Sequence, residues 1–222
     1  MEKTGIINRI HKGLRTWLFE TGIIIQETDF SSTQEGMKSV TLLKKVLNVT
    51  DRKSTIDETH VLPVLVLHAP YMVSLMDAEI QRVNGISERL SGYISSYMQP
   101  GTEAYHAATG FSIQQVYSEF MGSVLIYMNR LETLISEFYH AITAADMTEL
   151  MDAAQMMHID GANRMIIEEW IYKGMSKAEI SGWLSDERKL SGNWIKKGLN
   201  RLFADVITSH EHATPGMKIE AA

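Results

Sequence analysis

Apolar residues recur along most of the chain at intervals of three and four positions, the spacing that gathers side chains on one face of an α-helix. We find no convincing stretch with the strict alternation of apolar and polar residues that is typical of β-strands. The pattern therefore predicts an all-α protein. Four long helices are expected, with approximate bounds 6–25, 33–62, 70–97 and 112–138.

Turn-forming residues separate these four segments. The loops fall at 29–32, at Ala69-Pro70 and at Gln99-Pro100-Gly101, and proline suits the first turn of the helix that follows it. Ser112 and Gln115 have the spacing of a capping box, which predicts that the fourth helix starts there. The polar residues 50–53 either break the second helix or form a patch on one long helix. Short loops between long helices favour an antiparallel four-helix bundle.

The chain continues beyond the fourth helix with shorter helical segments. Thr143 and Asp146 repeat the capping spacing and predict the start of another helix. Apolar periodicity is lost after residue 209. We therefore expect three parts, which are a bundle over 1–142, C-terminal helices packed on the bundle over 143–209, and a flexible tail over 210–222.

Composition narrows the range of functions. The 222 residues include no cysteine, which excludes disulfides, thiolate metal sites and a cysteine nucleophile. The most apolar stretch, residues 61–69, is too short to cross a membrane, and the first residues do not resemble a secretion signal, so we expect a cytoplasmic protein. Residues 61–170 carry four basic and thirteen acidic side chains, which argues against nucleic-acid binding by the main body.

Few ionisable groups fall on faces that the pattern predicts to be buried. His11 lies beside the apolar face of the first helix, whereas Arg15 is expected to point away. Asp57 and His60 are three residues apart, a spacing that can offer two ligands to one metal ion but is also common at helix ends. On the third helix, Asp77 and Glu79 cannot both face inward. The common nucleotide-binding, hydrolase and metalloprotease motifs are absent, so the sequence predicts no enzyme.

The order of several short segments resembles the hemerythrin-like proteins, also called HHE cation-binding domains. These segments are His11 followed by Leu14-Arg15, then Arg52-Lys53, Asp57-Glu58 and Val61-Leu62-Pro63, and later the stretches 142–150 and 178–184. The resemblance is best over about the first 150 residues. It implies a four-helix bundle whose centre binds two non-haem irons through histidines and carboxylates.

The same resemblance shows which metal ligands are substituted. Lys53 stands where the family has a histidine, and Asp57 where a glutamate is usual. Residues 77–80 replace a histidine pair, and Tyr127 and Leu131 replace a histidine and a glutamate. We therefore expect that the di-iron site is lost, that no cofactor is bound, and that the protein has a non-enzymatic binding, sensing or scaffold role. If Lys53 points inward, it should lie near a carboxylate, either Asp57 or Glu79, because an unpartnered buried ammonium is too costly.

Two alternatives remain open at this point. In the first, His11, Asp57, His60 and Glu79 form a remodelled site that binds non-haem iron and, through it, oxygen or nitric oxide. In the second, residues 174–184 begin a helix-turn-helix whose reading helix is 191–201, although the connection between the two is longer than that motif uses. The sequence does not identify a partner, and a homo-oligomer is compatible with it.

Overall fold

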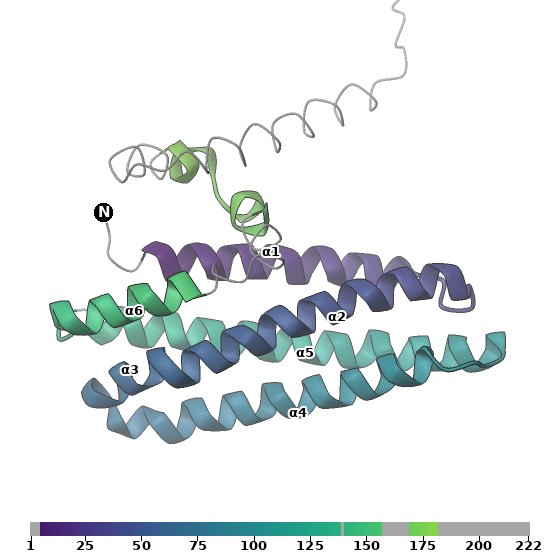
Figure 1. Cartoon of the computed structure of the whole chain (residues 1–222), viewed down its shortest axis with the longest axis horizontal. Helices are drawn as coiled ribbons and strands as arrows, with labels where there is room; N and C mark the ends of the chain where they lie inside the picture. Colours follow the sequence, from purple (N-terminus) through teal and green to yellow (C-terminus); the bar gives the residue numbers. More distant parts are fainter. Residues whose placement is uncertain (1–4, 139, 157–168, 182–222) are drawn as a thin grey trace, which may run out of the picture. The chain divides into compact units, whose positions relative to one another are not determined.

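The computed structural model describes residues 5–138, 140–156 and 169–181, and in these residues the protein is all-helical, without β-strands (Figure 1). The all-α prediction is therefore confirmed. The α-helices are α1 (Gly5–Glu27), α2 (Thr33–Ile56), α3 (Leu62–His68), α4 (Val73–Tyr97), α5 (Glu103–Phe138) and α6 (Ala144–Met156). No helix in the described parts of the chain combines the length and apolar character needed to cross a bilayer.

The second expected helix, residues 33–62, has no break in its helical structure. The polar residues 50–53 lie inside α2, so they form a patch and do not break the helix. A π-helical turn, η1 (Asp57–Val61), connects α2 directly to α3. Isolated π-turns within helices are frequent at functional sites. A short 3₁₀ turn, η2 (Pro70–Met72), then leads into α4.

The expected start of the fourth long helix was wrong. α5 begins at Glu103, nine residues before Ser112, and the Thr102 hydroxyl accepts the hydrogen bond from the Tyr105 amide at 3.2 Å that caps it. The Ser112 hydroxyl lies within the helix and donates to the Ala108 carbonyl at 3.3 Å. A capping pattern inside a helical segment is therefore satisfied by the helix's own backbone. The second predicted capping box is confirmed, because Asp146 and Thr143 exchange hydrogen bonds before α6.

The long helices α1, α2, α4 and α5 lie alongside one another and bury a common apolar core (Figure 1). At one end of these helices, α5 lies so close to Phe30 that position 110 requires glycine. A Cβ at Gly110 would lie 2.1 Å from the Phe30 Cβ. We call this region the aromatic end, and it contains Phe30, Tyr97 and His106 in edge-to-face contact. The largest fully buried side chains elsewhere in the core include Trp17, Tyr117, Phe120, Leu43, Met76 and Met128.

The chain divides into one compact unit over residues 1–175 and a second over 176–222. α6 belongs to the first unit, as do residues 169–174, which are helical and pack on α1. Trp170 stacks on Trp17 with ring centroids 5.6 Å apart, and a Cβ at Gly13 would meet the Ile171 backbone at 2.7 Å. The expected reading helix at 191–201 and the expected tail at 210–222 lie outside the described residues.

Candidate functional site

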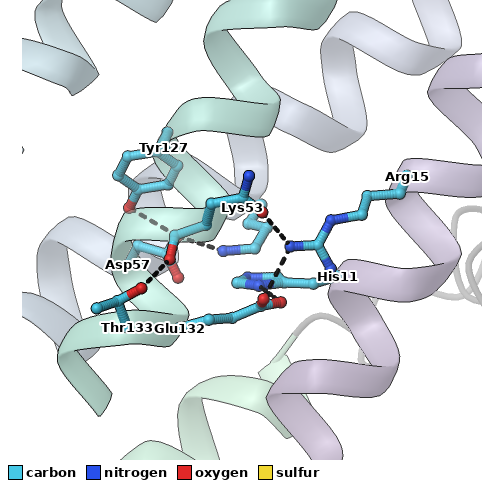
Figure 2. A network of polar contacts seen from close by, with 8 residues as sticks. His11, Arg15, Lys53, Asp57, Tyr127, Glu132 and Thr133 are labelled. Carbon is cyan, nitrogen blue, oxygen red and sulfur yellow. Dashed lines mark hydrogen bonds and ion pairs between the residues drawn. The ribbon is translucent and has the colours of Figure 1, made fainter. Parts of the chain in front are cut away.

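A group of ionisable side chains lies between α1, α2 and α5 (Figure 2), and all of its members except the partly exposed Glu132 are buried. We call it the polar centre, and it comprises His11 from α1, Lys53 and Asp57 from the end of α2 and the start of η1, and Tyr127 and Glu132 from α5. Charged groups are rarely buried unless they are paired. The arrangement of the pairs therefore decides what this region can do.

Lys53 and Asp57 form a buried ion pair at the middle of the polar centre. The two residues are only 6% and 4% exposed, and the Lys53 ammonium donates a hydrogen bond to Asp57 Oδ2. The Tyr127 hydroxyl donates to the same carboxylate oxygen at 2.8 Å (Figure 2). Burial raises the pKa of Tyr127, so its phenol keeps the proton that it donates. The prediction that an inward-facing Lys53 lies near Asp57 or Glu79 is confirmed for Asp57.

Helix geometry explains why Lys53 and Asp57 meet, whereas His60 has its partner on another helix. Lys53 and Asp57 are four residues apart and therefore lie on the same face of the helix. The π-turn begins at Asp57 and contains His60 three positions later. His60 is half-buried and contacts Glu149 of α6, with 2.8 Å between Nδ1 and the carboxylate. Asp57 and His60 therefore contact different partners, and a metal site that uses both stays a prediction.

His11 is completely buried and has a carboxylate partner on α5. Its Nδ1 lies 2.7 Å from Glu132 Oε1, and Arg15 donates to Glu132 Oε2 at 2.8 Å. Burial, and after it the positive charge of Lys53, lowers the pKa of His11 to about 4. Although burial alone would raise the pKa of Glu132, hydrogen bonds from His11 and Arg15 lower it to about 2. At neutral pH a carboxylate therefore faces a neutral imidazole.

This pairing fixes the imidazole tautomer. An ionised carboxylate can only accept, so Nδ1 must be the nitrogen that carries the proton. Nε2 of His11 then carries a lone pair, and this atom is buried without a hydrogen-bond partner among the described residues. The second nitrogen, Nε2, is therefore a hydrogen-bond acceptor at neutral pH.

The four residues considered as metal ligands do not converge. His11 and Asp57 line the same small pocket, together with Lys53. His60 faces Glu149, as described above, and the Glu79 carboxylate of α4 lies 2.5 Å from the Arg130 guanidinium. Within the described residues no three histidine or carboxylate side chains are grouped so that they could hold a metal ion. The donor set as it stands, with an ammonium beside its one central carboxylate, does not fit a metal ion.

Sequence reasoning missed some members of this region. Arg15 was expected to point away from the core, yet it binds Glu132 and Asn129. The signal was present, because Arg15 lies four residues after His11 and both can reach one acidic side chain. No sequence signal identified Glu132 as the partner of His11, since the two residues are 121 positions apart.

Comparison with protein-family models, with curated proteins and with solved structures found no match to this chain. The resemblance to the hemerythrin-like proteins therefore stays a prediction from the sequence.

Proposed function

We propose that the four long helices form a hemerythrin-like antiparallel bundle in which the Lys53 ammonium supplies the positive charge that metal ions provide in that family. In this proposal the protein binds no iron and acts without catalysis, as a binding, sensing or scaffold protein. The observation that carries the proposal is the buried ion pair between Lys53 and Asp57, with Tyr127 donating to the same carboxylate.

The physical argument concerns the buried carboxylate. A carboxylate in this environment needs a cation or several hydrogen-bond donors, because desolvation of an unpartnered charge is very costly. The Lys53 ammonium and the Tyr127 hydroxyl supply both at Asp57 Oδ2. A metal ion at the same carboxylate would have to displace the ammonium and would also be repelled by it.

The protons and hydrogen bonds of Tyr127, His11 and Lys53 support a non-catalytic role. The Tyr127 phenol keeps its proton, the His11 Nδ1 proton is committed to Glu132, and the Lys53 ammonium is committed to Asp57. Tyr127 and Lys53 both satisfy the buried Asp57 carboxylate, and His11 donates to the partly exposed Glu132. These contacts therefore connect α1, α2 and α5 to one another. A structural use of this kind is compatible with a binding, sensing or scaffold protein.

Elemental analysis tests the proposal directly. The protein would be produced without a histidine tag in iron-supplemented medium and analysed for iron and zinc. We expect much less than one metal ion per chain, and two irons per chain would refute the proposal. A Lys53→His variant, which removes the ammonium and offers an imidazole, should bind more metal than a Lys45→His control at an exposed position of α2.

The alternative of a remodelled metal site draws on one specific observation. His11 Nε2 is available, and Asp57 lines the same pocket. These two groups alone make an incomplete ligand set for iron or zinc. Stoichiometric metal that is lost in a His11→Gln variant would favour this alternative.

A further inference from the structure

A small pocket adjoins the polar centre on the side that α6 covers. Its volume is about 20 Å³, and it lies between α1, the α2–η1 junction and α6. Within the part of the chain that the structure describes, three polar side chains line it, namely His11, Lys53 and Asp57. The other lining residues are apolar and are Ile7, Ile10, Ile56, Val61 and Ala153.

His11, one of the pocket-lining residues, carries a buried acceptor, Nε2, without a hydrogen-bond partner in the described part of the chain. The atom is fully buried, accepts no hydrogen bond within the described residues, and belongs to a side chain that lines the pocket. Leaving a buried acceptor unsatisfied is costly, so an occupant that donates a hydrogen bond to it is favoured. The volume is sufficient for one water molecule and for little more.

The charges in the pocket wall select an uncharged occupant. The Lys53 ammonium disfavours a cation, and the Asp57 carboxylate disfavours an anion. Water matches the remaining requirements, because it can donate to His11 Nε2 and exchange further hydrogen bonds with Lys53 or Asp57. A buried water commonly has two to four polar partners.

We propose that the pocket is an internal binding site for one small uncharged hydrogen-bond donor, water being the occupant, with His11 Nε2 as its acceptor and α6 as its cover. Among the described side chains, α6 contributes Ala153 to the pocket lining, and this residue is 1% exposed. Elsewhere α6 is attached by the buried Leu150 and by contacts of His60 with Glu149 and of His68 with Asp146. The site does not depend on the hemerythrin-like assignment.

The experiment measures the nitrogen-15 resonance of His11 Nε2 at neutral pH, in metal-free protein treated with a chelator. We expect the resonance of an unprotonated nitrogen that accepts a hydrogen bond. Relaxation dispersion of the oxygen-17 signal of water should show a long-lived internal water molecule in the same sample. A resonance typical of an imidazole nitrogen that accepts no hydrogen bond would overturn the proposal, and so would a resonance that differs between untreated protein and chelator-treated protein.

A variant that fills the pocket tests the proposal, and the same substitution at an exposed position of α6 is its control. Ala153→Val places two methyl groups in the pocket, whereas Ala145→Val adds them at an exposed position of the same helix. We expect Ala153→Val to move the Nε2 resonance to the position of an imidazole nitrogen that accepts no hydrogen bond, and to remove one long-lived water. Ala145→Val should change neither observation. Val61→Ile, which fills the pocket from η1, gives the same test if Ala153→Val fails to fold. An unchanged Nε2 resonance in a folded filled variant would contradict the proposal.

Discussion

The aromatic end and the polar centre each bury a histidine, but they hold it by different physical means. At the aromatic end, the His106 ring lies 4.8 Å from the Tyr97 ring, and the fit depends on the small size of Gly110 beside Phe30. In the polar centre, His11 is held by a carboxylate and lies near an ammonium. One region is specified by shape and the other by charge.

This difference predicts how each region responds to change. Close packing is sensitive to added volume and insensitive to pH. A buried charge network tolerates changes that remove both partners of a pair, but it is sensitive to the loss of one partner and to protonation. Substitutions and pH can therefore separate the two regions.

The largest effect is expected from removing the central cation. Lys53→Met leaves the Asp57 carboxylate buried without its counter-charge, so the free energy of unfolding should fall by about 3–5 kcal/mol. Urea unfolding followed by circular dichroism measures the loss. The exposed Lys45→Met should change the value by less than about 0.5 kcal/mol. The double variant Lys53→Met with Asp57→Leu should recover much of the stability, and a loss equal to that of the single variant would contradict a charge-based explanation.

Acidification should destabilise the polar centre selectively. The pKa of His11 falls from 6.5 to about 4 on folding because of burial and the Lys53 charge, so between these pH values the unfolded chain binds more protons than the folded one. Stability should therefore decrease by about 3 kcal/mol as the pH falls from 6.5 to 4. Below pH 4.5, the unfolded chain also binds a proton at Glu132, whose pKa is about 2 in the folded protein. The free energy of unfolding therefore decreases further.

The control for this pH dependence compares the two regions. His11→Gln should flatten the slope between pH 6.5 and 4, whereas Tyr97→Phe at the aromatic end should lower stability equally at all pH values in this range. Urea midpoints measured at several pH values provide the data. If both variants keep the slope of the parent, His11 is not its source.

Added volume should affect the aromatic end. Gly110→Ala places a Cβ within 2.1 Å of Phe30, so the aromatic ring must shift, and we expect a loss of about 1–3 kcal/mol that does not depend on pH. Gly122→Ala on the same helix, where a Cβ meets nothing within 4 Å, should be neutral or stabilising by up to about 1 kcal/mol. Thermal melts distinguish these results, and equal effects at both glycines would refute the packing explanation.

The smallest effect is expected where α6 is attached. His60→Gln and His68→Gln weaken partly exposed contacts with Glu149 and Asp146, each with an expected cost of at most about 1 kcal/mol. Hydrogen exchange should nevertheless become faster in α6 while α5 stays protected, because both contacts attach α6 to the neighbouring η1 and α3. Uniformly faster exchange in both helices would show that α6 does not open separately.

The sequence predicted the local features of this fold more successfully than the distant pairings. Apolar periodicity identified the all-α class and most helix bounds, because burial of one helix face leaves a local signature. The start of α5 was missed, since the Ser112 pattern is also compatible with the interior of a helix. A carboxylate partner of Lys53 was predicted as either Asp57 or Glu79, and the structure shows Asp57, which lies four residues further along the same helical path.

The rest of the site depends on contacts between distant segments. The partners Glu132 of His11 and Tyr127 of Asp57 lie on α5, and no spacing rule connects them to α1 or η1. The π-turn that begins at Asp57 and contains His60 is a further feature that the sequence did not predict. A break in helix regularity of this kind is set by tertiary packing, which one sequence does not reveal.

The central claim is that the Lys53 ammonium holds the place of a metal ion. Its most direct test is the melting temperature of the metal-free parent and of Lys53→His, each measured with and without ferrous or zinc ion. A ligand that binds the folded state raises the melting temperature. We predict no metal-dependent rise for the parent and a rise for Lys53→His. A large metal-dependent rise in the parent, abolished by His11→Gln, would contradict the claim.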